Sequence, residues 1–298
     1  MTDASGTGWS DKADSPQPSA ELIFHDAAGA ASILAQVRNL PMPLPPDSSV
    51  CPDRAHHPYD RCTRRSLSGG SALVIDQGYV DPLAPGGIQQ WTAELTTAAG
   101  HQTLIRELNA STAQATTATR PTPPLTPSQL TTAVLDKHWR PVLTALPTTA
   151  TPPRVPSTGL LTKNQIVSTL RTMLPSTFHV SDLEGAEKGY VDLVIDDGHG
   201  PGLLTVTDQQ WAPKDSKIAE VFKAAKQQAD GGRLLTRQVP SPEGAGAVQW
   251  EADILYSNGH RLLVTELNSS AYGLTPTRPQ PPLSLRQLTT IVRNSSWH

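Results

Sequence analysis

Apolar and polar residues alternate along Trp91–Thr97, so that every second side chain is apolar. This period of two is typical of a half-buried antiparallel strand. Ala99-Gly100 then turns the chain, and Gln102–Asn109 returns as a second strand. The pattern therefore predicts a β-hairpin.

The hairpin belongs to a pattern that occurs twice. The first copy runs from Trp91 to Trp139 and the second from Trp250 to Trp297. Both contain the motifs E-L-N and R-P-x-P-P-L, and the turn of the second copy is Asn258-Gly259, which is the strongest short hairpin signal. A repeat of this length indicates an internal duplication and hence two homologous domains.

Comparison of the two halves changes the interpretation of the chain before Pro41. The run D-A-A-G-A-A-S-I-L-A-Q-V looks helical by propensity, but Glu21–Gly29 parallels the β-rich run Asp192–Gly200. We therefore expect two strands, Glu21–His25 and Ser32–Val37, joined by a turn near residues 28–30.

Three segments share one helix-start pattern. Each has a Ser or Thr N-cap, a Gln three residues later and a Leu before the cap, which together make a capping box and a hydrophobic staple. The N-caps are Thr126, Thr162 and Ser284. Helices are expected from each cap, with Thr162–Leu174 and Leu285–Asn294 as the two in the second half.

The remaining segments complete an α+β fold of two tandem homologous domains, each a meandering antiparallel β-sheet with helices packed on one face. The other expected elements are strands at Ser71–Gly78, Phe178–Asp182, Val191–Ile195, Leu203–Thr207, Arg233–Val239, Gln249–Tyr256 and Arg261–Asn268, and a helix at Ser216–Ala229. The expected divisions are a disordered tail at 1–19, a first α+β repeat at 20–147, a Thr/Pro linker at 148–158 and a second α+β repeat at 159–298.

Composition excludes some classes of partner. The net charge is −3 with both signs mixed, so no binding to nucleic acid is expected. No apolar run approaches the roughly 18 residues of a membrane span. Residues 1–20 are polar and do not have the pattern of a signal peptide. The protein is therefore expected to be either cytoplasmic or exported by a segment that is not in this chain.

Several motifs resemble a known group of proteins. These motifs are Y-V-D-L-V-I-D-D-G-H-G, a C-x10-C spacing followed by S-A-L-V-I-D-Q-G-Y, and R-P-x-P-P-L-[ST]-x2-Q-L. The chain after residue 20 resembles uncharacterised actinobacterial proteins that are mostly predicted to be exported or membrane-anchored and that carry this domain in duplicate. The resemblance implies an extracytoplasmic location and a duplicated architecture, and it implies no activity.

Two cysteines and two histidines lie close together in the segment C-P-D-R-A-H-H-P-Y-D-R-C. Cys51, His56, His57 and Cys62 are chemically a possible zinc set, but the adjacent histidines lack the usual separated spacing. A disulfide between Cys51 and Cys62 closes a short loop and suits an exported protein. We predict the disulfide, and no metal or cofactor.

Five acidic or histidine residues are candidates for binding. Asp196, Asp197 and His199 could bind a cation or act as an acid–base pair, but a β-turn also explains their residue types. Glu107 and Glu266 occupy equivalent places in the two E-L-N motifs.

A pair of carboxylates suggests a glycosidase only if the two converge, here across the domain interface. Otherwise each glutamate is expected to meet a backbone amide or a local arginine, Arg120 or Arg278. The four tryptophans of the repeats are expected to be core or helix-end anchors.

The sequence contains none of the common nucleotide-binding or hydrolase motifs. The leading hypothesis is therefore a non-enzymatic extracytoplasmic module that binds, senses or scaffolds an unknown ligand. A cell-envelope protein or glycan is the expected kind of partner. The alternatives are a glycan hydrolase with carboxylates at the domain interface and a metal-binding protein that uses the Cys51–Cys62 loop.

Overall fold

The computed structural model describes residues 3–7, 18–45, 48–147, 160–183, 188–212, 215–229, 231–240 and 246–297. The chain divides into two compact units. The first comprises Met1–Pro52 and Tyr59–Arg154, and the second comprises Asp53–Pro58 and Val155–His298. The predicted linker at 148–158 lies outside the described residues.

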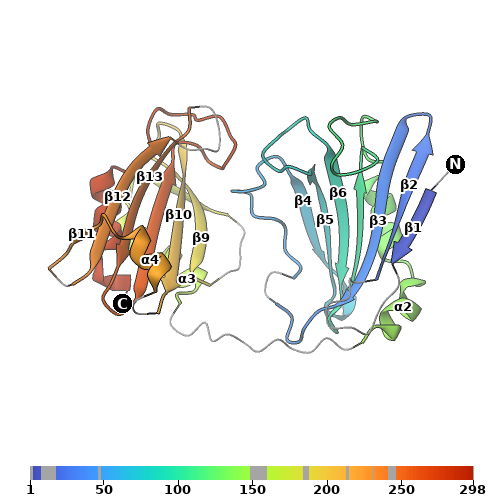
Figure 1. The fold of residues 1–298 in the computed structure, drawn as a ribbon, viewed down its shortest axis with the longest axis horizontal. Coiled ribbons are helices and arrows are strands. Elements are labelled where there is room, and N and C mark those ends of the chain that lie inside the picture. Colours follow the sequence, from blue (N-terminus) through green and yellow to red (C-terminus); the bar gives the residue numbers. More distant parts are fainter. Residues whose placement is uncertain are drawn as a thin grey trace. The chain divides into compact units, whose positions relative to one another are not determined.

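The first unit is built on a seven-stranded antiparallel sheet with the order β1-β2-β3-β7-β6-β5-β4 (Figure 1). Its strands are β1 Asp3–Thr7, β2 Ser19–Asp26, β3 Gly29–Asn39, β4 Arg61–Ser66, β5 Ala72–Tyr79, β6 Gln89–Thr96 and β7 His101–Leu108. Its helices are α1 Pro127–Val134 and α2 Trp139–Ala145, with a 3-10 turn at Ser68–Gly70.

The second unit has an antiparallel sheet with the order β8-β9-β10-β14-β13-β12-β11. Its strands are β8 His179–Asp182, β9 Tyr190–Asp196, β10 Pro201–Gln210, β11 Lys226–Gln227, β12 Arg233–Pro240, β13 Val248–Leu255 and β14 His260–Leu267. Its helices are α3 Lys163–Met173, α4 Ser216–Val221 and α5 Leu285–Val292, followed by a 3-10 turn at Ser295–Trp297.

The two sheets correspond strand by strand. Each strand of the first order has a counterpart at the same place in the second, from β1 and β8 to β4 and β11. The registers agree as well, because Trp91 lies opposite Glu107 and Trp250 lies opposite Glu266. The common topology confirms the α+β fold and agrees with the duplication inferred from the repeated motifs.

One face of each sheet packs against helices. In the first unit, Leu130 and Val134 of α1 join Leu73, Ala93 and Ile105 of the sheet in a buried cluster. In the second unit, α3 and α5 pack into the corresponding cluster, which includes Ile254. Helix α4 instead packs against Leu255, and because successive strand residues point to opposite faces, α4 covers the other face of this sheet.

The predicted helix starts are confirmed. The side chains of Thr126, Thr162 and Ser284 each accept the backbone N–H of the third helical residue, a Gln, whose own side chain accepts the cap's backbone N–H. The predicted hairpin before Pro41 is also present, because β2 and β3 pair with Asp26 opposite Gly29.

Two expectations were wrong. The helix predicted at Ser216–Ala229 ends at Val221, and Lys226–Gln227 pairs with β12 as strand β11, because a sheet edge is available there. Asp3–Thr7, expected in a disordered tail, pairs with β2 as strand β1. None of the described helices is long and apolar enough to cross a membrane.

Candidate functional site

Glu107 and Glu266 are fully buried, and each side chain accepts a hydrogen bond from a backbone N–H group. A carboxylate oxygen of Glu107 accepts the N–H of Leu125 at 2.9 Å, and both oxygens of Glu266 accept the N–H of Leu283 at 2.9 and 3.1 Å. Each leucine immediately precedes a helix N-cap. The glutamates therefore fix the start of the helix that crosses their sheet, and neither side chain is open to a ligand.

Burial makes both carboxyl groups weaker acids than an exposed glutamate. It raises the pKa of Glu107 to about 7 and that of Glu266 to about 8, while the backbone hydrogen bonds act in the opposite direction. Near neutral pH, each group carries a proton in a large fraction of molecules. Their role in the fold does not require a charge.

The arginines of the two R-P-x-P-P motifs pair with a different carboxylate. Arg120 bonds both oxygens of Asp26 at 3.2 and 3.3 Å, and Arg278 bonds both oxygens of Asp197 at 2.6 and 3.0 Å. The hydrogen bond from Arg278 is the main reason that the pKa of Asp197 falls to about 2. Of the two kinds of partner expected for the glutamates, the structure shows the backbone amide.

Asp196 and His199 belong to the turn between β9 and β10. Asp196 accepts the backbone N–H groups of Gly198 and Gly200 at 2.8 and 3.2 Å, as turn-forming aspartates commonly do. The His199 side chain is exposed, and its Nδ1 lies 3.6 Å from Asp197. The described chain shows no group of three or more metal-ligating side chains, here or elsewhere.

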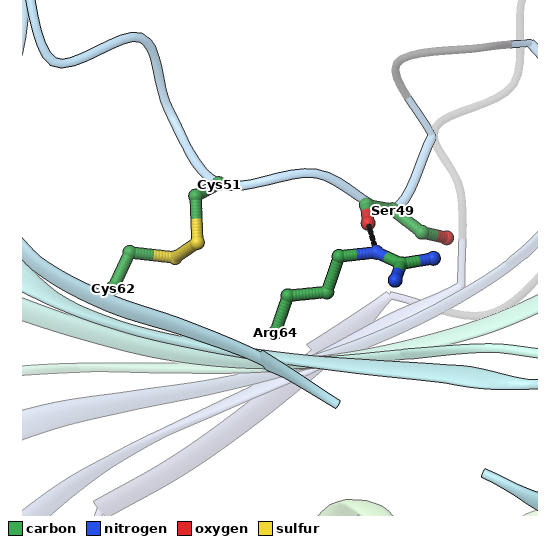
Figure 2. Close-up of a disulfide and its surroundings, with 4 residues drawn as sticks. All are labelled: Ser49, Cys51, Cys62 and Arg64. Atoms are coloured by element: carbon green, nitrogen blue, oxygen red, sulfur yellow. Dashed lines mark hydrogen bonds between the residues drawn. A yellow bond between two sulfur atoms is a disulfide. The ribbon is translucent and has the colours of Figure 1, made fainter. Parts of the chain in front are cut away.

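Cys51 and Cys62 form the predicted disulfide, and both lie in the first unit (Figure 2). Cys62 is on β4, and the nearby Arg64 of the same strand donates to the backbone oxygen of Ser49 at 2.6 Å. The disulfide and this hydrogen bond thus hold the chain before β4 at two points, Cys51 and Ser49. Because both sulfurs are in the bridge, neither is available as a thiolate ligand, which contradicts the zinc hypothesis.

The residues between the two cysteines contribute a polar cluster to the second unit. His56 lies 3.0 Å from the Tyr190 hydroxyl, which donates to Asp192 at 2.8 Å, and the Thr205 hydroxyl also donates to Asp192. Burial raises the pKa of Asp192 to about 6. All these groups have protein partners, and the completely buried Ala55 beside them indicates that the cluster anchors residues 53–58.

A groove of about 470 Å³ lies at one end of the second sheet, between the β12–β13 pair and the R-P-Q-P-P segment. Gln238 on β12 is directly opposite Trp250 on β13, and Pro279 and Gln280 form the other wall. We call this the Trp250 groove. Every described residue that lines it is uncharged.

Trp250 and its counterpart Trp91 differ in hydrogen bonding from Trp139, Trp211 and Trp297, whose indole N–H groups have acceptors among the described residues. The indole N–H groups of Trp139 and Trp297 donate to a carbonyl in the preceding helix at 2.7 and 2.6 Å, which makes these residues helix-end anchors as predicted. Trp250 is only 9% exposed, yet within the described chain its indole N–H has no acceptor. Gln238 and Gln280 also line the groove, and both side chains are exposed.

The sequence does not predict the groove, because its pattern indicates a core residue at Trp250. It is part of the core, but it also lines the groove. The repeat contained a partial signal, since the first unit also places a glutamine, Gln77, directly opposite its tryptophan, Trp91. Strand pairing was needed to bring these two residue types together.

No protein family and no curated protein matches this chain. A search of solved structures finds a similarity to the crystal structure of MucB in complex with MucA(peri), at 10% sequence identity over 84% of this chain and 81% of that chain. The TM-score is 0.20, which is too low to indicate a shared fold or function.

Proposed function

We propose that this protein is a non-enzymatic extracytoplasmic binding module and that the Trp250 groove is its binding site. The observation that carries the proposal is the indole N–H of Trp250, which the core holds at a groove whose described lining is uncharged and which has no acceptor among the described residues. A volume of about 470 Å³ is within the usual range for ligand sites. Tryptophan side chains that are apolar at one end and a donor at the other are common at interfaces.

The disulfide supports a location outside the cytoplasm. Disulfides form and persist mainly in oxidising compartments, and this one joins the only two cysteines of the chain. The resemblance to exported or membrane-anchored actinobacterial proteins points to the same location, with a cell-envelope protein or glycan as partner.

The two alternative functions have less support. A glycan hydrolase would need two accessible carboxylates on either side of a sugar, whereas Glu107 and Glu266 are buried and bonded to backbone amides. A metal-binding loop would need the thiolates of Cys51 and Cys62, which the disulfide consumes.

Binding to immobilised cell-envelope material tests the proposal. The double variant Gln238→Ala/Gln280→Ala removes both groove amides from exposed positions. We expect it to lose most of the binding shown by the wild type. Gln227→Ala/Gln228→Ala is the matched control, because it removes two surface amides of the same unit that do not line the groove. Equal binding by all three proteins would show that the groove is not the site.

A further inference from the structure

On the basis of the proposed binding function, we propose that the Trp250 groove takes an extended, uncharged peptide segment. In this arrangement, a backbone carbonyl of the partner accepts the indole N–H of Trp250, and the amides of Gln238 and Gln280 bond its neighbouring peptide groups. The partner is thus recognised through its backbone and its lack of charge.

The burial of Trp250 favours a peptide over a sugar. The ring is a member of the large core cluster of the second unit and is 9% exposed, so its faces pack against protein. A sugar usually needs an exposed aromatic face on which to stack. Trp250 instead presents a donor, and grooves lined by aromatic side chains are a recurring way in which proteins bind extended peptides. Pro240 and Pro279 line the same groove and add no charge to it.

Residues 238–240, which line the groove, also belong to a sheet edge on β12 that is free of other described strands. Strand β11 pairs with β12 only through Arg233 and Leu234, and no other described strand pairs with this edge. The outer edge of Leu235–Pro240 therefore carries backbone groups without a strand partner. An extended peptide can bond to such an edge as an added strand. At about 3.3 Å per residue, six residues match the length of this edge.

The lining of the groove favours partner segments without charged side chains. All of its described residues are neutral, so an acidic or basic side chain placed there would gain no counter-ion from the described part of the chain. We therefore expect neutral segments to bind and their charged analogues to be excluded.

A peptide-binding measurement tests this inference on the full chain. The probes are fluorescent acetylated and amidated hexapeptides randomised over Ala, Val, Thr, Gln and Pro, with a second set that carries Asp or Lys at the two central positions. Fluorescence anisotropy should show saturable binding of the neutral set and at least tenfold weaker binding of the charged set. Trp250→Phe, which removes the indole donor and keeps an aromatic ring, should raise the Kd about tenfold, as expected for one hydrogen bond.

Matched variants guard against loss of folding. Trp211→Phe is the control for Trp250→Phe, because Trp211 is in the same unit, donates to Gln209 at 2.9 Å and does not line the groove. It should leave the Kd unchanged. If Trp250→Phe does not fold, Gln238→Ala/Gln280→Ala replaces it, since both glutamines are outside the core and their loss should weaken binding by at least tenfold.

Neutral oligosaccharides, offered in the same assay, separate the two proposals. If an oligosaccharide binds and the glutamine double variant abolishes its binding while hexapeptides do not bind, the binding function stands and the peptide inference is overturned. If neither kind of probe binds and envelope material does not distinguish the variant from the wild type, both proposals are wrong. Equal binding of neutral and charged hexapeptides also overturns the inference.

Discussion

Glu107 and Glu266 hold the same place in the two units and explain why the E-L-N motif occurs in both. The carboxyl group accepts the N–H of the residue before the helix cap. The asparagine that ends the motif, Asn109 or Asn268, accepts a backbone N–H from the neighbouring strand segment and donates to the carbonyl of the motif arginine. Two side chains of one strand end thus fix the whole R-P-x-P-P-L segment.

Replacing Glu266 by glutamine should weaken the dependence of stability on pH. In the unfolded chain the glutamate titrates near its ordinary pKa of 4.5, whereas burial raises the folded value to about 8. Its contribution to stability is therefore fully present below pH 4.5 and is lost as the pH rises through 8. At about 1.4 kcal/mol per pKa unit, the loss is on the order of a few kcal/mol.

Urea unfolding at pH 5 and pH 8.5 measures this effect. Glu266→Gln should lose less stability than the wild type between these two pH values, because its amide stays neutral. The equivalent variant Glu107→Gln should show a smaller difference that is complete near pH 7, in line with the lower pKa of Glu107. Parallel pH profiles for the wild type and Glu266→Gln would contradict this role.

At the scale of the element, one helix start is used three times. Each cap satisfies backbone N–H groups that the first helical turn leaves without a partner. In α1 and α5 the glutamate of the preceding strand also holds the residue before the cap. Helices of eight residues are too short to be stable alone, so caps and packing together determine where they begin.

Removing one cap should cost about 1 kcal/mol of unfolding free energy. Ser284→Ala loses the hydroxyl that accepts the N–H of Gln287 at 3.3 Å and that bonds its side chain at 2.7 Å. Chemical unfolding measures the change. Ser284→Asp is the control, because aspartate also caps helices and should retain most of the stability. If alanine and aspartate destabilise equally, the cap is not what serine contributes.

At the scale of the whole molecule, the Cys51–Cys62 segment contributes residues to both units. The disulfide belongs to the first unit, while Asp53–Pro58 between its cysteines belongs to the second. Ala55 is fully buried beside Leu203 and Leu267, and the His56 ring stacks on Tyr272 with centroids 4.7 Å apart. Residues 53–58 therefore pack with the second unit, although the chain on both sides of them belongs to the first.

Opening the disulfide should destabilise the protein. A bridge between residues 11 positions apart restrains a short loop of the unfolded chain, an effect of about 2–3 kcal/mol. The double variant Cys51→Ser/Cys62→Ser should unfold at lower urea concentration than the oxidised wild type and should not respond to dithiothreitol. The wild type should show no thiols accessible to alkylation until it is reduced. Two free thiols in protein isolated from its native compartment would remove the main support for an extracytoplasmic location.

The sequence by itself determined the strands other than β1, β4 and β11, together with the hairpins, the capping boxes and the equivalence of Asp26 with Asp197. These features depend on residue period, on turn chemistry within a few positions and on comparison of two copies. It also determined the disulfide, because only two cysteines are present and they are close in the chain. Signals of this kind can be recognised in the sequence because they depend on neighbouring residues and not on distant contacts.

Tertiary structure alone decided what the distant partners are. Burial against α1 and α5 gave Glu107 and Glu266 a backbone amide rather than an arginine, and pairing with β12 ended the helix predicted at Ser216–Ala229. Only the pairing of β12 with β13 placed Gln238 beside Trp250 at the edge of a groove. These outcomes depend on contacts between residues far apart in the chain, which no local pattern encodes.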